Sequence, residues 1–331
     1  MKIAVLFYGQ PRFLDITKDR FLEEFSLPGH EFHFFMHFWE EIGFTPTCDD
    51  RARYIINDNL QNDIEYLQPK KYNITDYTDL DLLNNILKNT LNFIEHGKVK
   101  YKTYDNKTRY TFGQHLSLKK AYGLMSKYEE ENNFKYDAVI KARPDFIYKD
   151  KACYKSEEKY IQTKINSYIL DFSKYGDNYT HTAALATQEY NLEEQKWIMS
   201  TINEYNPKTR NINRDKYHGL RCGDVGVCCS RTAANFIFNR WFDTYIQTFI
   251  RDIRRNAHTK LQLHRRHDSL QGEIILNNNI TAKRLKKSRL HRVSYKNIMK
   301  DKWLNHDCIC LDTSSTNKRL DIENFMKGVK V

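Results

Sequence analysis

The chain has 331 residues, of which 40% are hydrophobic and 14% aromatic, with only 12 glycines and 6 prolines. This composition excludes a disordered or low-complexity protein, and a chain of this length can bury a sizeable core. The formal net charge of +11 favours an anionic partner: a nucleic acid, a phosphorylated small molecule or an acidic membrane surface.

The first part of the chain alternates strands and helices. The apolar stretch KIAVLFY predicts a strand that ends in the turn GQPR at 9–12, and HEFHFFMHFW predicts a second strand over 30–39. A helix or a turn fits residues 13–26 between them, and apolar spacing close to 3.6 predicts helices over 79–95 and 112–133. The order strand, helix, strand is typical of a parallel sheet.

The second part continues this alternation with less regular spacing. Residues 136–148 predict a strand, and the elements expected after it are strands over 160–170 and 183–190, a helix over 189–203, a short buried strand VGVCCS, an aromatic helix over 231–253, a helix at QGEIILNNNI and a basic stretch over 283–302. The sequence shows no internal repeat, so the simplest prediction is one α/β domain with a C-terminal elaboration.

The cysteines and the N-terminus indicate the compartment. The seven cysteines include no CxxC pair, so we interpret them as reduced thiols, which are typical of the cytosol. The first residues run straight into a strand without a secretory signal, and no stretch has the roughly 20 apolar residues of a membrane span. We therefore expect a cytoplasmic protein, and peripheral contact with a membrane stays open.

The strand YDAVIKARPDFIY at 136–148 carries charges where a sheet needs packing. Because side chains alternate along a strand, Lys141, Arg143 and Asp145 are expected on one face together with Val139. Buried charges must be paired or must bind something. The charges therefore predict either a structural ion pair or a ligand site, and both interpretations stay open.

Polar residues also follow the other predicted strands. Ligands of open parallel sheets bind beyond the carboxyl ends of the strands. Three such ends are polar here, at 9–12, at 37–40 and at 143–145. Their convergence would form one site, although an ordinary turn would also explain the glycine and proline at 9–12.

The segments YGQPR, FFMHFW, YDAVIKARPDF and GLRCGDVGVCCS, in this order, resemble a family of bacterial and viral sugar transferases. The family includes the WavE-like lipopolysaccharide glycosyltransferases and is similar to the GT-A nucleotide-sugar enzymes. The resemblance implies a GT-A-like, Rossmann-like mixed and mostly parallel sheet flanked by helices over residues 1–280, with a helical and basic extension over 281–331 packed on the same domain. It also implies that a hexosyl or pentosyl group moves from a nucleotide-sugar donor to a glycan or lipid-linked saccharide acceptor in polysaccharide biosynthesis, with no nucleic-acid partner.

The resemblance further implies a donor site. Its expected residues are Gly9, Gln10, Arg12, His37 and Arg143, with a divalent cation, Mn²⁺ or Mg²⁺, on Asp145. GT-A enzymes hold this cation with Asp-x-Asp, but here Arg143 replaces the first carboxylate. Either Asp145 still binds a metal while Arg143 holds a phosphate, or cations of the protein take the place of the metal. A literal Asp-x-Asp at 79–81 is better explained as the acidic start of a helix.

Two carboxylates are candidates for the catalytic base. Asp224, between Gly223 and a buried strand, could deprotonate an acceptor hydroxyl or bind the acceptor, or could simply belong to a turn. Glu273 could serve instead, although on an amphipathic helix it would more often be solvated. The basic stretch at 283–302 could cover the donor diphosphate or contact an anionic membrane. The rival hypotheses are a basic nucleic-acid-binding protein and a metal-dependent phosphodiesterase.

Overall fold

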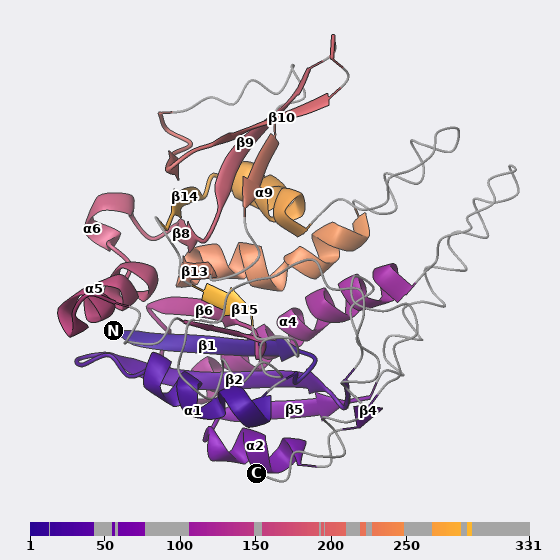
Figure 1. Cartoon of the computed structure of the whole chain (residues 1–331), viewed down its shortest axis with the longest axis vertical. Helices are drawn as coiled ribbons and strands as arrows, with labels where there is room; N and C mark the ends of the chain where they lie inside the picture. Colours follow the sequence, from indigo (N-terminus) through magenta and orange to yellow (C-terminus); the bar gives the residue numbers. More distant parts are fainter. Residues whose placement is uncertain are drawn as a thin grey trace, which may run out of the picture.

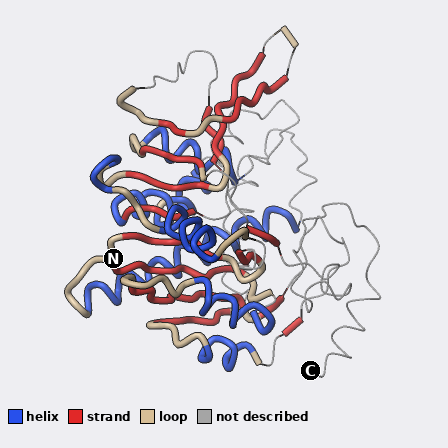
Figure 2. The backbone as a smooth tube through the Cα atoms, turned by 60° about the vertical axis from the view of Figure 1, so that its left-hand side comes forward, coloured by secondary structure: helices blue, strands red, loops and turns tan. Residues whose placement is uncertain are grey.

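The computed structural model describes twelve segments of the chain, residues 1–12, 14–42, 55–56, 59–76, 106–148, 154–191, 193–194, 196–209, 219–222, 227–247, 267–285 and 290–292. They build an eight-stranded sheet in the order β11-β14-β8-β13-β6-β1-β2-β5 (Figure 1). Figure 2 shows its strands following one another across the molecule, with helices on either side. Among the described helices, none is long and apolar enough to cross a membrane.

One half of the sheet is parallel. It consists of β5 (Lys71–Thr75), β2 (Glu31–Trp39), β1 (Lys2–Gly9) and β6 (Ala138–Ala142). In β1, Val5 lies between Phe34 of β2 and Ile140 of β6. The strand is buried along nearly its whole length, as the continuous apolar run predicts for a parallel strand covered on both faces.

The other half of the sheet is mixed. It consists of β13 (Val227–Ser230), β8 (Tyr179–Thr182), β14 (Thr281–Arg284) and β11 (Glu204–Tyr205). Strand β13 is antiparallel to both β6 and β8, β14 is parallel to β8, and β11 is antiparallel to β14. The predicted α/β class with a mixed, mostly parallel sheet flanked by helices is therefore confirmed. Strand β14 directly follows the predicted boundary at residue 280 and lies inside the sheet, and the division into 1–280 and 281–331 stays a prediction.

Each face of the sheet has its own layer of helices. Helices α1 (Leu14–Glu24), α2 (Leu60–Tyr66) and α5 (Glu157–Tyr168) pack with α6 (Phe172–Tyr175) on the face that carries Val5. The face that carries Leu6 is covered by five helical segments, namely α4 (Asn106–Glu131), α7 (Arg231–Ala234), the π-helix η3 (Asn235–Asn239), residues 241–247 and α9 (His267–Asn277).

Three smaller sheets complete the described part. Strands β9 (Leu185–Asn191), β10 (Lys196–Thr201) and β12 (Gly219–Cys222) form an antiparallel sheet, and the β9–β10 hairpin extends beyond the main sheet (Figures 1 and 2). The remaining pairs are β7 (Phe146–Tyr148) with β15 (Leu290–Arg292), and β3 (Glu41–Ile42) with β4 (Ile55–Ile56).

Two predicted elements have the wrong type. The strand expected over 160–170 is the helix α5: Ser156 caps it by accepting a hydrogen bond from the backbone N–H of Lys159, and the buried Tyr160, Lys164 and Tyr168 recur every four residues. The helix expected over 189–203 is instead strand β10, because cross-strand pairing with β9 overrides the helical propensity of this stretch.

Other predictions were right in type but not in extent. The strand expected over 136–148 is interrupted after Ala142 and resumes as β7 at Phe146. The aromatic helix expected over 231–253 is divided into α7, the π-helical segment and a helical segment at 241–247, and its remainder lies outside the described residues. The helix expected over 79–95, with Asp79 and Asp81, also lies outside them.

Candidate functional site

The carboxyl ends of the parallel strands meet at one edge of the sheet, here called the carboxyl edge. Strand β1 ends at Gly9 beside Phe38 of β2, and Phe7 pairs with Ala142, the last residue of β6. Strand β13 begins at the same edge, because its Val227 pairs with Lys141. The polar ends at 9–12 and 143–145, which were expected to converge, therefore follow neighbouring strands of the sheet.

The turn after β1 has an unusual backbone. Gly9 has a φ of +93°, a conformation that favours glycine, and a Cβ added there would meet no described atom within 4 Å. The backbone N–H of Leu14 donates to the carbonyl of Pro11 at 3.3 Å as α1 begins. Within the turn, the guanidinium of Arg12 donates to the side-chain oxygen of Gln10. The turn thus combines a backbone open to close approach with a cation held by its neighbour.

His37 lies beneath this edge and is fully buried. Its Nδ1 is 2.7 Å from the hydroxyl of Ser117 on α4, and its Nε2 is 3.0 Å from the hydroxyl of Thr75 on β5. The Ser117 hydroxyl donates to the His37 carbonyl at 2.8 Å and accepts from the backbone N–H of Gly9 at 2.7 Å. A neutral imidazole that donates from Nδ1 and accepts at Nε2 satisfies all these bonds. His37 therefore holds the Gly9 turn in place through Ser117, and its predicted contact with a donor stays a prediction.

Arg143 and Asp145 form a two-pronged ion pair after β6. Arg143 Nε donates to Oδ1 of Asp145 at 2.9 Å, and Nη2 donates to Oδ2 at 2.8 Å. The Asp145 side chain is 4% exposed and that of Arg143 is 21% exposed. Between them, the carbonyl of Pro144 accepts a buried 3.0 Å hydrogen bond from Thr17 of α1. The ion pair that the sequence predicted as one alternative is present, on a segment anchored at its centre.

Side chains alternate between the two faces of the sheet along β6, as expected. Val139 packs with the α4 layer, and Lys141 points to the same face, with Nζ 4.3 Å from the ring centroid of Trp241. Trp241 in turn packs against the ring of His115, at 4.6 Å between centroids. Lys141 is 3% exposed, so its charge lies against an aromatic surface.

Of the two candidate bases, the described residues include Glu273. Asp224 is outside the described residues, which resume at Val227 on the carboxyl edge. Glu273 is half-buried on α9, a helix that packs against β12 so closely that a Cβ on Gly272 would lie 1.7 Å from the carbonyl oxygen of Leu220. The amide of Gln271 donates to the Cys222 sulfur at 3.6 Å. Helix α9 is thus fixed beside the end of β12, and both catalytic roles stay predictions.

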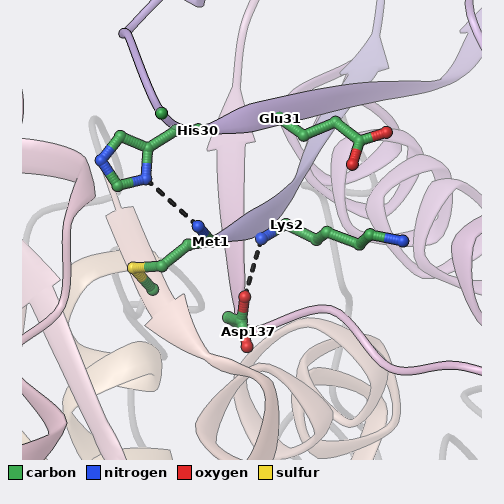
Figure 3. Close-up of a pocket in the computed structure, with 6 residues that line it drawn as sticks. Met1, Lys2, His30, Glu31 and Asp137 are labelled. Carbon is green, nitrogen blue, oxygen red and sulfur yellow. Dashed lines mark hydrogen bonds between the residues drawn. The ribbon is translucent and has the colours of Figure 1, made fainter.

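A shallow cavity of about 500 Å³ lies at the opposite edge of the sheet, where β1 and β2 begin (Figure 3). Met1, Lys2, Gly29, His30, Glu31 and Asp137 line it. The N-terminal ammonium is 3.4 Å from His30 Nδ1, and the Lys2 backbone N–H donates to Asp137 at 2.7 Å. Burial and the ammonium lower the pKa of His30. No residue predicted for the site lines this cavity.

The described residues do not provide the ligands of a metal site. They contain no group of three or more His, Cys, Asp or Glu side chains that could hold a metal ion. Both oxygens of Asp145, the predicted ligand, already accept hydrogen bonds from Arg143. The described donor set therefore does not fit the divalent cation that the resemblance implies.

No protein-family model and no curated protein matches the sequence. Two solved structures of the glycosyltransferase GlyE from Streptococcus pneumoniae TIGR4, one of them the apo form, align with 99% of this chain at 11% identity and TM-scores of 0.29 and 0.31. This chain spans 60% of the length of those two neighbours. TM-scores this low support no conclusion about the function of this chain. The resemblance to WavE-like transferases stays a prediction.

Sequence reasoning missed the residues that support the site from other elements. Ser117 is a buried hydroxyl on the apolar face of α4, and this mismatch of residue type and position was the available signal. Trp241 and His115 carried no signal, because aromatic residues at helical spacing are ordinary core residues.

Proposed function

We propose that the protein is a glycosyltransferase that binds a nucleoside-diphosphate sugar at the carboxyl edge and transfers the sugar to a glycan or lipid-linked acceptor. The observation that supports this most is the adjacency of the Gly9 turn and the Arg143–Asp145 segment at the ends of neighbouring parallel strands. Ligands of open α/β sheets bind at such ends, and an Arg-Pro-Asp here stands where the resemblance places the Asp-x-Asp of GT-A enzymes.

The donor half of the proposed site provides positive charge. Arg12 and Arg143 are planar cations suited to the two oxygens of a phosphate, and Gly9 has no side chain to keep a ligand from the backbone. Transfer breaks the bond between the anomeric carbon and the diphosphate, so negative charge grows on the leaving group. Cations fixed beside it stabilise that charge in the transition state.

The acceptor half is assigned to Asp224, with Glu273 as the alternative. In an inverting reaction, the carboxylate takes the proton of the acceptor hydroxyl as its oxygen bonds to the anomeric carbon. We expect Asp224→Asn to lower turnover about 100-fold and to leave the Kd for the nucleoside diphosphate within about twofold. Initial rates and calorimetry separate these quantities, and an equal loss of both would assign Asp224 a structural role.

The proposed setting is the cytoplasmic side of a membrane. A lipid-linked saccharide would present the acceptor there, and the basic residues over 283–302 would contact anionic headgroups. Vesicles with and without anionic lipid would show whether such contact occurs.

A nucleotide screen tests the proposed function. UDP, GDP, CDP, ADP and dTDP are each added at millimolar concentration, and we expect one of them to raise Tm by several degrees, because a ligand at about 100 times its Kd stabilises the fold by about 2.7 kcal/mol. The matching nucleotide sugar should then release its nucleoside diphosphate slowly without an acceptor. If none of the five binds and random DNA binds with strong salt dependence, the nucleic-acid hypothesis replaces this one.

A further inference from the structure

We infer that donor binding needs no divalent cation, because Arg143 takes the position that a metal on Asp145 would occupy. This inference rests on the proposed function and concerns the same site. It assigns Arg143 the contact with the donor diphosphate, and it makes Asp145 a positioning residue that holds Arg143.

The carboxylate of Asp145 is already engaged by Arg143. Both oxygens of Asp145 accept N–H groups of Arg143, at 2.9 and 2.8 Å. Each oxygen keeps a second lone pair, but a hard cation bound there at about 2.0–2.6 Å would lie next to the positive guanidinium, which repels it. To avoid that repulsion the metal would have to displace a guanidinium that is itself mostly buried, and an unpaired buried charge is strongly unfavourable.

The Arg143–Asp145 pair is local in the sequence. Its two residues are only two positions apart, so the ion pair connects no distant parts of the chain. The bond from Thr17 to the Pro144 carbonyl already fixes the segment without it. The pair therefore adds little to the tertiary structure, but it fixes the orientation of the guanidinium.

The two side chains of the pair differ in their exposure to solvent. Of the two side chains, Asp145 is the one shielded from solvent, at 4% exposed, while Arg143 retains 21%. The charge that reaches the surface is thus positive, which suits a diphosphate and disfavours a free cation.

Calorimetry with and without metal tests the inference. The nucleoside diphosphate selected from UDP, GDP, CDP, ADP and dTDP is titrated into the full chain in an excess of EDTA and again in an excess of Mn²⁺. We expect Kd values within about threefold of each other. Binding seen only with Mn²⁺ would overturn the inference while the proposed function stands, whereas binding in neither condition would overturn both.

Variants separate the two residues. Arg143→Gln should weaken binding at least about 30-fold in EDTA, because it removes the charge-assisted contact. Asp145→Asn should weaken it less, by about three- to tenfold, and equally in EDTA and in Mn²⁺, because only the orientation of Arg143 is lost. A metal ligand at Asp145 would instead give a loss confined to the Mn²⁺ titration, which would contradict the inference.

A matched control guards against loss of folding. Arg20 forms an exposed ion pair with Glu23 on α1, at 3.0 Å, and Arg20→Gln should change neither titration. Arg143→Lys keeps the charge without the two-pronged geometry and should bind more tightly than Arg143→Gln. If Arg143→Lys and Arg143→Gln both bound as the parent does, with unchanged Tm, Arg143 would not contact the donor.

Discussion

Two arginine–carboxylate pairs with nearly the same geometry lie at opposite edges of the central sheet. At the carboxyl edge, Arg143 binds Asp145 at 2.9 and 2.8 Å, and at the other edge Arg231 binds Glu129 through Nε and Nη2 at 2.8 Å each. Both arginine side chains are 21% exposed and both carboxylates are nearly buried. Distance and burial alone therefore do not separate the two pairs.

The pairs differ in what they connect. Glu129 and Arg231 are 102 positions apart, and Glu129 also accepts the backbone N–H of Tyr136 at 3.0 Å and the ammonium of Lys135 at 3.1 Å. This pair fastens the end of α4 to the beginning of α7 and to the strand that follows α4. The Arg143–Asp145 pair joins neighbours in sequence. The comparison teaches that a long-range pair stabilises the fold, while a local one orients a side chain.

Removal of the long-range carboxylate should have the largest effect. Glu129→Ala leaves the Arg231 guanidinium and the Tyr136 N–H without their partner, so we expect the free energy of unfolding to fall by about 3–5 kcal/mol. Asp145→Asn should lower it less, by about 1–2 kcal/mol, because the asparagine oxygen still accepts one N–H of Arg143, whose guanidinium is 21% exposed. Urea denaturation of both variants measures the two values, and equal losses would remove the distinction between the pairs.

Two buried glutamates with opposite pKa shifts sharpen the comparison. Burial tends to raise the pKa of Glu129, but the hydrogen bonds from Arg231 and the Tyr136 N–H outweigh it, and the pKa is lowered. Burial raises the pKa of Glu24 from 4.5 to about 7, although Lys164 and the hydroxyl of Tyr168 act in the opposite direction. Cationic and hydrogen-bonding neighbours thus keep a buried glutamate charged only where their effect outweighs that of burial.

The sign of each shift sets the pH dependence of stability. Between pH 4.5 and about 7 the folded state binds more protons at Glu24 than the unfolded state does, so this group lowers stability as pH rises through that window. The shift corresponds to roughly 3 kcal/mol at most. The free energies of unfolding of the parent and of Glu24→Gln, plotted against pH, should diverge across this window. The variant should become the more stable of the two, relative to low pH, as pH rises. Parallel curves would contradict the shift.

Glu129 should behave in the opposite way. Its lowered pKa contributes stability that is present above the unfolded pKa and is lost as pH falls through the folded one. The difference in stability between the parent and Glu129→Ala should therefore shrink on acidification below about pH 4, near the reference pKa of a glutamate. A difference that stays constant with pH would mean that packing, not charge, explains the loss.

Conservative exchanges should show the smallest effect. Arg143→Lys is expected to weaken donor binding about tenfold at nearly unchanged Tm, because an ammonium cannot make the two-pronged contact. Arg231→Lys should do the reverse, lowering Tm while donor binding stays the same. Calorimetry measures donor affinity and thermal unfolding measures Tm for both variants. A fall in Tm for Arg143→Lys alone would make Arg143, and not Arg231, the structural residue.

Sequence reasoning predicted β1 and β2 of the parallel half, because they are continuous apolar runs that end in glycine, proline or polar residues, but it predicted no element at β5. It failed at α5, where the Ser156 cap and the four-residue spacing of Tyr160, Lys164 and Tyr168 were the signals that went unused. Strand β10 could not be recognised because its stability comes from β9, a partner that no local pattern reveals.

The site was predictable only as far as strand ends could be read. The ends of β1 and β6 were identified, and the alternative of an ion pair between Arg143 and Asp145 was available from their spacing. The bonds that place them were not, since Ser117 is 80 positions from His37 and Thr17 is 127 from Pro144. Contacts across such separations depend on how the helices pack, and no spacing in one sequence encodes them.

Hydrogen exchange with a bound nucleoside diphosphate tests most directly whether the carboxyl edge is the donor site. Exchange of the backbone amides is followed by mass spectrometry with and without the tightest binder from the nucleotide screen. The account predicts slower exchange over 9–12 and 141–145, and no change at the cavity lined by Met1, His30 and Asp137. Protection at that cavity, with the carboxyl edge unchanged, would contradict it.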